Sequence, residues 1–341
     1  MSSRPALAEL TTFRIGGPIA SLVVATSEHD LIEAVRAADS AGTPVLLIGG
    51  GSNLLCADAG FAGTVIAIRT RGIDVVEIGT AVRLTVAAGE SWDALVARAV
   101  GHGWSGIEAL SGIPGLVGAT PVQNVGAYGQ DISQVIREVN AWDRSTSSLV
   151  TLTREMCEFG YRSSRFKREP GRYVVLEVVI ELTAGNLGAV EYSQLARQLD
   201  VNVGDELPLA RIREAVLALR REKGMVLDDD DTDTWSAGSF FTNPIVDIVT
   251  AATIPVECPR YPSESGVKLS AAWLIENAGI ERGFRVSDAA RARVSTKHTL
   301  ALTNTGGATA ADMRELADVI RRRVLEVFGI ELVPEPQLAG F

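Results

Sequence analysis

The sequence has few of the residues that thiol and metal chemistry require. Its three cysteines, Cys56, Cys157 and Cys258, stand about a hundred residues apart and form no CxxC pair. Such isolated thiols are typical of reduced, mostly buried cysteines in a cytosolic protein. The sequence has only three histidines, and none has metal-ligand spacing, so we expect no metal site.

The chain also lacks a long apolar run and an excess of basic residues. No stretch approaches the roughly 20 apolar residues of a transmembrane helix, and the N-terminus has no signal-peptide core. The 42 acidic residues outnumber the 32 basic ones, which gives a net charge of −10. This balance disfavours nucleic acid and anionic membranes as partners. We expect a cytoplasmic monomer in which local basic residues attract any anionic substrate.

Glycine, by contrast, is concentrated in one stretch. Residues 111–129, SGIPGLVGATPVQNVGAYG, alternate glycine and proline with apolar residues and are called the glycine-rich stretch below. A core strand would not tolerate so much glycine, because glycine loses the most backbone entropy on folding. Glycines let the backbone come close to a large flat ligand and direct its N–H groups at an anion. This property favours a dinucleotide cofactor as the ligand of the stretch. A set of tight turns is the alternative, and the stretch alone does not separate the two.

A second glycine-rich segment, GGGSN at 49–53, follows a predicted strand at 44–48. It does not match GxGxxG leading into a helix, which disfavours a Rossmann nucleotide site. The two segments lie about sixty residues apart in the sequence. We expect them to clasp a cofactor from two sides.

The remaining pattern mixes strands with amphipathic helices. Helices are predicted at 28–41, 91–101, 208–223, 270–278 and 310–328, and a strand is predicted at 238–249. The run DDDDTD at 228–233 marks a change of composition. Such a run is usually a solvated linker, and a cation site is the alternative.

Six blocks, in order along the chain, carry a resemblance to a known family. They are GGGSNLL at 49–55, the glycine-rich stretch, YRSSRFK at 161–167, AGSFFTNP at 237–244, AAWLIENAGI at 271–280 and PEP at 334–336. Over residues 12–336 the chain resembles the MurB family of UDP-N-acetylenolpyruvoylglucosamine reductases. It is similar to the first type, in which a tyrosine loop closes over the substrate.

The resemblance implies an α+β fold. A vanillyl-alcohol-oxidase-type FAD-binding domain in two parts would be followed by a C-terminal α/β substrate-binding domain. We expect the two FAD-binding parts at 1–70 and 71–228 and the substrate-binding domain at 229–329. The tail 330–341 is expected to return to the second part.

The resemblance also implies a reaction. Members of the family reduce UDP-N-acetylglucosamine enolpyruvate to UDP-N-acetylmuramate with NADPH, in peptidoglycan precursor synthesis for the cell wall. Hydride transfer needs a flavin because side chains cannot carry hydride. Neither glycine-rich segment has a histidine or cysteine to tether a flavin, so we expect non-covalent FAD. The expected partners are the UDP-sugar enolpyruvate and NADPH.

The resemblance assigns three catalytic residues. Ser239 would donate a proton to the enolate, which a hydroxyl can do if its geometry is fixed. Arg162 would bind the enolpyruvyl carboxylate with its permanently charged, planar guanidinium. Glu335, held extended between two prolines, would be the second acid. A strand hydroxyl, a surface arginine and a solvated tail carboxylate are the structural alternatives.

The resemblance also assigns binding residues. Those for the cofactor are Gly49, Gly50, Gly51, Ser52, Asn53, Ser111, Gly112, Ile113, Pro114, Gly115, Gly118, Ala119, Gln123, Asn124, Gly126, Ala127 and Tyr128. Tyr161, Tyr192, Lys223 and Asn243 would bind substrate, with Tyr192 and Lys223 at the diphosphate. The tail departs from the family after Glu335, where PQL replaces a frequent Val-Arg-aromatic run.

Two other functions stay open at this point. The first is an oxygen-using flavin oxidase of the same fold, which would share the glycine-rich segments but has no need of Arg162, Ser239 and Glu335 together. The second is a non-catalytic binding module that has kept the fold. A flavin spectrum of the purified protein with substrate turnover would separate the three.

Overall fold

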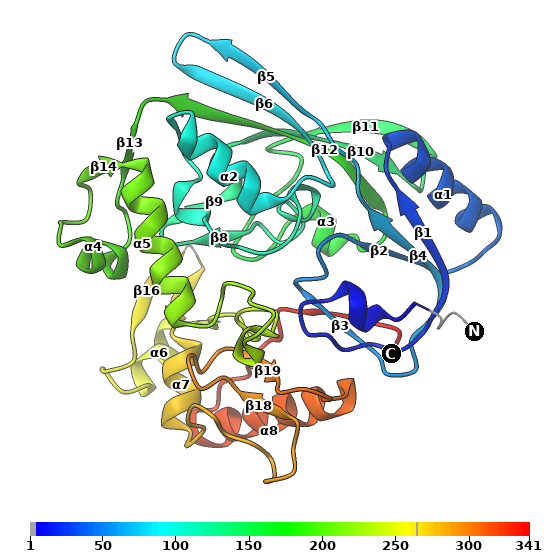
Figure 1. The fold of residues 1–341 in the computed structure, drawn as a ribbon. Helices are drawn as coiled ribbons and strands as arrows, with labels where there is room; N and C mark the ends of the chain where they lie inside the picture. The colour runs from blue at the N-terminus through cyan, green and yellow to red at the C-terminus, as the bar shows by residue number, and fades with distance from the viewer. Residues whose placement is uncertain (1–4, 264) are drawn as a thin grey trace. The chain divides into compact units, whose positions relative to one another are not determined.

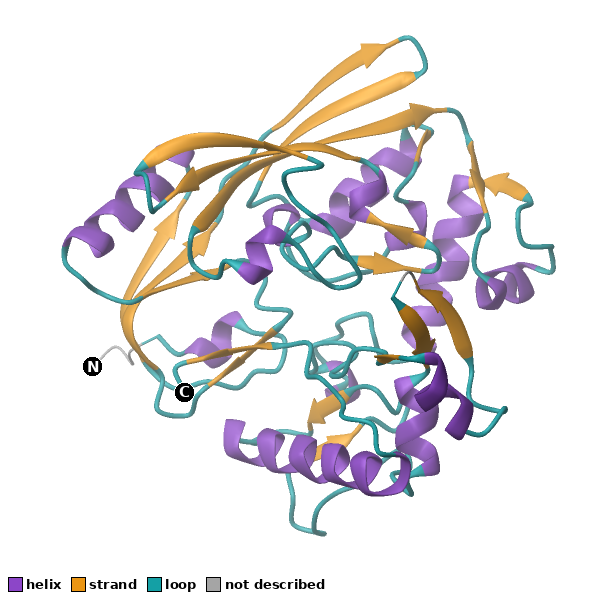
Figure 2. Cartoon of the chain, turned by 180° about the vertical axis from the view of Figure 1, so that it is seen from behind, coloured by secondary structure: helices purple, strands orange, loops and turns teal. Residues whose placement is uncertain are grey.

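The computed structural model describes residues 5–263 and 265–341, which form two compact units (Figure 1). The first unit comprises Met1–Ile19, Gly51–Phe61 and Lys223–Phe341. The second comprises Ala20–Gly50 and Ala62–Glu222. Both units contain helices and strands (Figure 2). The expected division into three domains stays a prediction.

A six-stranded antiparallel sheet is the centre of the second unit. Its order is β11-β10-β12-β6-β5, with β7 also paired to β12. The strands are β5 (Ile73–Ile78), β6 (Ala81–Ala87), β7 (Trp104–Ser105), β10 (Ile136–Asp143), β11 (Ser148–Thr153) and β12 (Tyr173–Ala184). Helix α2 (Trp92–Gly101) packs its apolar side on this sheet through Trp92, Leu95 and Val96 (Figure 1). The predicted helix at 91–101 is therefore confirmed, with Ser91 as its N-cap.

A smaller sheet of the second unit has the order β1-β4-β2. Its strands are β1 (Ile19–Ala25), β2 (Val45–Ile48) and β4 (Phe61–Ile68), and helix α1 (Glu28–Ser40) connects the first two. Ser27 Oγ accepts a hydrogen bond from Asp30 N at 3.1 Å, and the Asp30 carboxylate accepts one from Ser27 N at 3.1 Å. This reciprocal capping satisfies two backbone donors at the start of α1.

Two helices complete the second unit. They are α4 (Ser193–Leu199) and α5 (Leu209–Glu222), and α4 lies in the chain between the antiparallel strands β13 (Leu187–Ala189) and β14 (Glu206–Pro208). Leu195 of α4 and Ile212, Val216 and Leu219 of α5 belong to one buried cluster. The predicted helix at 208–223 is confirmed, whereas the sequence pattern had not indicated α4.

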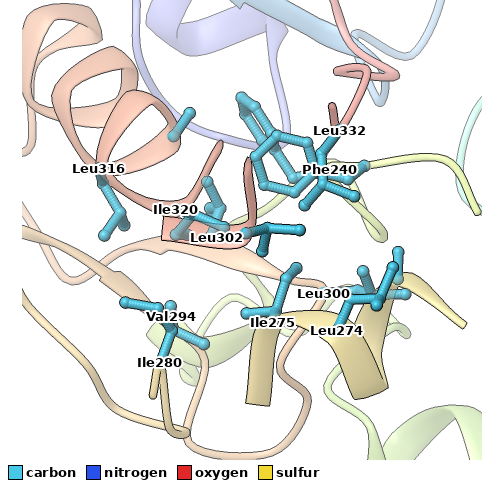
Figure 3. Packing of buried hydrophobic residues seen from close by; sticks show 14 of the residues in the cluster. Phe240, Leu274, Ile275, Ile280, Val294, Leu300, Leu302, Leu316, Ile320 and Leu332 are labelled. Carbon is cyan, nitrogen blue, oxygen red and sulfur yellow. The ribbon is translucent and has the colours of Figure 1, made fainter. Parts of the chain in front are cut away.

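The first unit is built around its own apolar core (Figure 3). Its helices are α6 (Ile248–Thr253), α7 (Ala271–Asn277) and α8 (Ala310–Phe328). Its strands are β15 (Ile245–Val246), β16 (Arg260–Ser263) and β17 (Gly266–Leu269) in one sheet, β18 (Ala292–Val294) with β19 (Leu302–Asn304), and β3 (Leu54–Cys56) with β20 (Gln337–Ala339). Phe240, Leu302, Leu316 and Ile320 meet in the core (Figure 3).

One expectation about the first unit is wrong. The predicted strand at 238–249 is confined to β15, because Gly238 has a positive φ of 70° and α6 begins at Ile248. The end of the tail forms β20, which pairs in parallel with β3 in the first unit, and the expected return of the tail to residues 71–228 stays a prediction. Among the described residues, no helix is long and apolar enough to span a membrane.

Candidate cofactor and active site

In the second unit Gly49 and Gly50 of the GGGSN segment lie against the glycine-rich stretch. A Cβ atom placed on Gly50 would stand 2.8 Å from Gly115 Cα, so only backbone fits between them. Gly115 O accepts a hydrogen bond from Trp92 N at 3.1 Å, and Gly49 O accepts one from Arg69 Nη1 at 3.0 Å. Hydrogen bonds to their carbonyl groups hold the two backbone segments in place. Such a pair of segments suits a cofactor that must lie directly against the backbone.

An acidic side chain that the sequence analysis missed holds the start of the glycine-rich stretch. Asp93 Oδ1 accepts from Gly112 N at 2.6 Å and from Arg213 Nη1 at 2.6 Å, and Oδ2 accepts from Arg213 Nη2 at 2.9 Å. Burial raises the pKa of Asp93, but the hydrogen bonds from Arg213 and Gly112 outweigh it and the pKa is lowered overall. The only signal in the sequence was its place in the first turn of α2.

Two of the predicted cofactor residues use their side chains to shape the stretch. Ser111 is fully buried, and its hydroxyl donates to Glu108 O at 2.6 Å. Asn124 has a φ of 48°; its amide donates to Gly160 O at 3.2 Å, and its oxygen accepts from Ser133 N at 3.1 Å. These side chains therefore support the stretch from within.

Arg162 is in contact with the glycine-rich stretch. Its Nη1 donates to Asn124 O at 3.3 Å and its Nη2 to Gly126 O at 2.7 Å. Its guanidinium carbon lies 5.6 Å from the centre of the Tyr161 ring, and its backbone has a φ of 51°. The backbone of the glycine-rich stretch therefore orients the Arg162 guanidinium. The helix α3 (Arg165–Arg168) begins three residues later.

Tyr128 and Tyr192 meet near a buried arginine. Their rings form an edge-to-face pair with centroids 5.8 Å apart, and Tyr192 is the residue just before α4. Arg220 of α5 is only 7% exposed, although its helix pattern placed it on the polar side. Burial lowers the pKa of Arg220, while the nearby Tyr128 and Asp93 act to raise it. A guanidinium stays protonated in proteins, so Arg220 is a buried positive charge beside Tyr128.

In the first unit, Ser239 and Glu335 lie on neighbouring extended segments. Glu335 N donates to the carbonyl oxygen of Phe240, the residue after Ser239, at 2.8 Å. On its other side Ser239 forms an isolated bridge with Ala301. Asn53 joins the same place, because its Nδ2 donates to Glu335 O at 3.3 Å. The fold thus brings the GGGSN, AGSFFTNP and PEP motifs together.

The two predicted substrate residues of the first unit have different surroundings. Asn243 Oδ1 accepts from Ala271 N at 2.9 Å, at the start of α7. Lys223 lies near His298, whose pKa is lowered to about 4, first by burial and then by the positive charges of Lys223 and Arg282. Lys223 and Arg282 thus place two positive charges near His298.

The acidic run is not a solvated linker. Asp229 pairs with Arg14, Asp231 with Lys297, and the buried Asp233 with Arg293. Because of these ion pairs, the expectation that the run is a solvated linker is wrong. Within the described part of the chain, no three His, Cys, Asp or Glu side chains are grouped to hold a metal ion.

Comparison with known proteins identifies two domain families. Residues 19–153 match the family described as FAD binding domain. Residues 230–339 match the family described as UDP-N-acetylenolpyruvoylglucosamine reductase, C-terminal domain. The first match includes both glycine-rich segments and confirms the expected FAD cofactor.

Relatives match over nearly the full length. The chain is 50% identical over 338 residues to the UDP-N-acetylenolpyruvoylglucosamine reductase of Cutibacterium acnes, covering 98% of this chain and 89% of that one. It is 52% identical over 347 residues to the protein of the same name from Streptomyces avermitilis, covering 98% and 93%. Among solved structures, UDP-N-acetylenolpyruvylglucosamine reductase (MurB) from Thermus caldophilus matches with a TM-score of 0.69 at 24% identity, covering 99% of this chain and 98% of that one. The structural match and the two domain families confirm the expected fold class.

Proposed function

Because the chain belongs to the UDP-N-acetylenolpyruvoylglucosamine reductase family, we propose that it reduces UDP-N-acetylglucosamine enolpyruvate to UDP-N-acetylmuramate with NADPH. It would do so as a cytoplasmic monomer in peptidoglycan precursor synthesis. The backbone of the two glycine-rich segments would hold FAD non-covalently, and FAD reduced by NADPH would supply the hydride for the methylene carbon. Side chains of this chain would supply the proton and stabilise the charge of the intermediate.

Ser239 is proposed to give the proton to the carbon that bears the carboxylate. The observation that carries this proposal is the 2.8 Å hydrogen bond from Glu335 N to Phe240 O, which ties the segments of Ser239 and Glu335 together. A fixed backbone on both sides of a hydroxyl is what proton transfer to an enolate requires. Glu335 is proposed to meet the enol end of the same intermediate.

Arg162 is proposed to hold the carboxylate and to stabilise the enolate charge. Its bonds to Asn124 O and Gly126 O orient the guanidinium without neutralising it, since a carbonyl group carries no net charge. Tyr161 is proposed to line the same part of the substrate site. A permanent positive charge held in place in this way stabilises developing negative charge in the transition state.

The sugar diphosphate is assigned to Lys223 and Tyr192. The positive charge of Lys223 contributes to lowering the pKa of His298. The same charge would attract a diphosphate bound beside Lys223. Tyr192 supplies an aromatic edge at the start of α4, packed on Tyr128. The amide of Asn243 caps α7, and we propose that it also lines the pocket.

The proposal is tested by stopped-flow measurement of the two half-reactions in wild type and in Ser239→Ala. Reduction of FAD by NADPH should stay within about twofold of wild type. Enolpyruvate-dependent reoxidation should fall by about 10²- to 10⁴-fold, the usual contribution of a positioned general acid. Thr242→Ala, which removes a hydroxyl three residues along the same segment, is the control and should leave both half-reactions intact.

Three outcomes would contradict the proposal. Equal loss in both half-reactions of Ser239→Ala would remove Ser239 from the acid role. Reoxidation of the wild type by oxygen but not by the enolpyruvate would indicate an oxidase. A protein that retains flavin but never turns over would indicate a binding module.

A further inference from the structure

The acidic run at 228–233 has a defined structure in the first unit. The Asp231 carboxylate caps the 3-10 helix Thr232–Thr234, accepting from Asp233 N at 3.0 Å, and also pairs with Lys297. Asp229, by contrast, keeps 83% of its side chain exposed while it pairs with Arg14. The run therefore contains both surface and interior carboxylates, and the interior one is Asp233.

Asp233 is 4% exposed, and both of its oxygens bind the chain at the end of β18. Oδ1 accepts from Arg293 Nη2 at 3.0 Å and from Thr296 N at 3.2 Å, while Oδ2 accepts from the Thr296 hydroxyl. A buried carboxylate is stabilised only when such donors replace its water. One side chain thus fixes the turn that leaves β18.

The same turn, residues 295–301, forms the wall beside Ser239. Ser295 N donates to Ala301 O at 2.8 Å, which closes the turn, and Ala301 is the bridge partner of Ser239. Phe240 N donates to Leu300 O at 2.7 Å. Asp233 therefore holds the start of a loop whose end forms a bridge with Ser239 and accepts a hydrogen bond from the next residue, Phe240.

The chain between Asp233 and Ser239 is also fixed. Trp235 O accepts from Asn304 N at 3.1 Å, and Ser236 Oγ accepts from Gly238 N at 3.1 Å. Gly238 then turns the chain with its positive φ of 70°. Asp233 and Ser239 are thus linked by two routes, along the chain and through the 295–301 turn.

We propose that Asp233 is a positioning residue for the reaction: by holding the 295–301 turn, it sets the place of the Ser239 hydroxyl. This inference rests on the proposed function, in which Ser239 is the proton donor. Asp233 itself is not proposed to touch the substrate. Displacement of a reacting group by about 1 Å can cost about 10²-fold in rate, so loss of this support should be visible in the protonation step.

The test compares Asp233→Ala, Asp233→Asn and Asp229→Ala in the full-length flavoprotein. Asp233→Ala should slow enolpyruvate-dependent reoxidation by about 10- to 100-fold and leave FAD reduction by NADPH within about twofold. Asp233→Asn should recover most of the rate, because its amide oxygen still accepts from Thr296 N and its amide N–H can donate to the Thr296 hydroxyl. Asp229→Ala should resemble wild type, since exposed ion pairs contribute little.

A second readout does not depend on turnover. Amide hydrogen exchange of peptides covering 236–241 and 295–302 should accelerate in Asp233→Ala and stay unchanged in Asp229→Ala. If Asp233→Ala does not fold, Thr296→Val replaces it in the test. This variant removes only the hydroxyl donor and should show the same changes to a smaller extent.

The two readouts separate the two hypotheses. Unchanged exchange, or slowed FAD reduction equal to the slowed reoxidation, would overturn the positioning role. So would faster exchange with reoxidation still within twofold of wild type. A wild type that never consumes the enolpyruvate would instead overturn the proposed function, while exchange would still show whether Asp233 holds the turn.

Discussion

Single residues show how burial in this fold changes chemical behaviour. All three cysteines are buried, as predicted, and burial raises the pKa of Cys56 to about 11 and that of Cys157 to about 12. A thiol with such a pKa is protonated at neutral pH and is a poor nucleophile. These two thiols are therefore not expected to act as nucleophiles.

His298 provides a pH-dependent prediction at this scale. Its pKa falls from 6.5 to about 4 on folding, so between these values the unfolded chain binds more protons than the folded one. Stability should therefore rise with pH between about pH 4 and pH 6.5, by at most about 1.4 kcal/mol per pH unit from this group. His298→Gln should flatten this rise, as measured by urea unfolding at pH 5 and pH 7.

Above pH 7 the histidine is neutral in both states, and its contribution to the pH dependence should vanish. A variant whose unfolding free energy keeps the wild-type slope between pH 5 and pH 7 would contradict the assignment. His29→Gln is the control, because His29 is exposed in α1.

At the scale of elements, the segments predicted to bind the cofactor are loops that pack against each other instead of helices or strands. Gly50 has no room for a side chain because Gly115 Cα would lie 2.8 Å from its Cβ. At Gly49 a Cβ would meet only the Leu116 side chain, at 3.4 Å or more. Neighbouring glycines thus differ sharply in what they tolerate.

We predict that Gly50→Ala loses most of its FAD, whereas Gly49→Ala keeps it. In Gly50→Ala two backbone segments must separate, while in Gly49→Ala a flexible leucine can shift by a few tenths of an ångström. The ratio of flavin to protein absorbance after gel filtration measures this, with the melting temperature as a second readout. Equal flavin content in the two variants would show that the contact between Gly50 and Gly115 does not matter for binding.

At the scale of the whole molecule, the first unit is assembled from segments far apart in the sequence. Phe13, Ile15 and Leu55 are at most 2% exposed and belong to the same core as α7 and α8. Asp58 caps α8, with Oδ1 accepting from Ala310 N at 2.8 Å and Oδ2 from Ala311 N at 3.2 Å. The C-terminal part thus completes its core with residues from the start of the chain.

Residues 223–341 are therefore predicted not to fold alone. Each large apolar side chain that is lost from the core removes about 1.5–3 kcal/mol, and three such losses approach the whole stability of a typical domain. Thermal unfolding of the isolated fragment, followed by circular dichroism, should show no cooperative transition. A sharp transition like that of the full chain would contradict this. Asp58→Ala in the full chain, which removes only a helix cap, should cost about 1 kcal/mol.

Some of this organisation could be predicted from the sequence because it depends on local patterns. The spacing of apolar residues predicted α1, α2 and α8. The six motif blocks were sufficient for the family, the FAD cofactor and the fold class. Each of these signals is contained in a short stretch of sequence, so no knowledge of distant contacts was needed.

What only the tertiary structure decided depends on partners far away in the chain. The acidic run reads as a linker until Arg293, about sixty residues on, supplies the charge that allows Asp233 to be buried. Arg220 reads as a surface arginine until α5 packs it beside Tyr128. A charged side chain has no local pattern that marks it as buried, because burial depends on counter-charges and donors that folding brings from elsewhere.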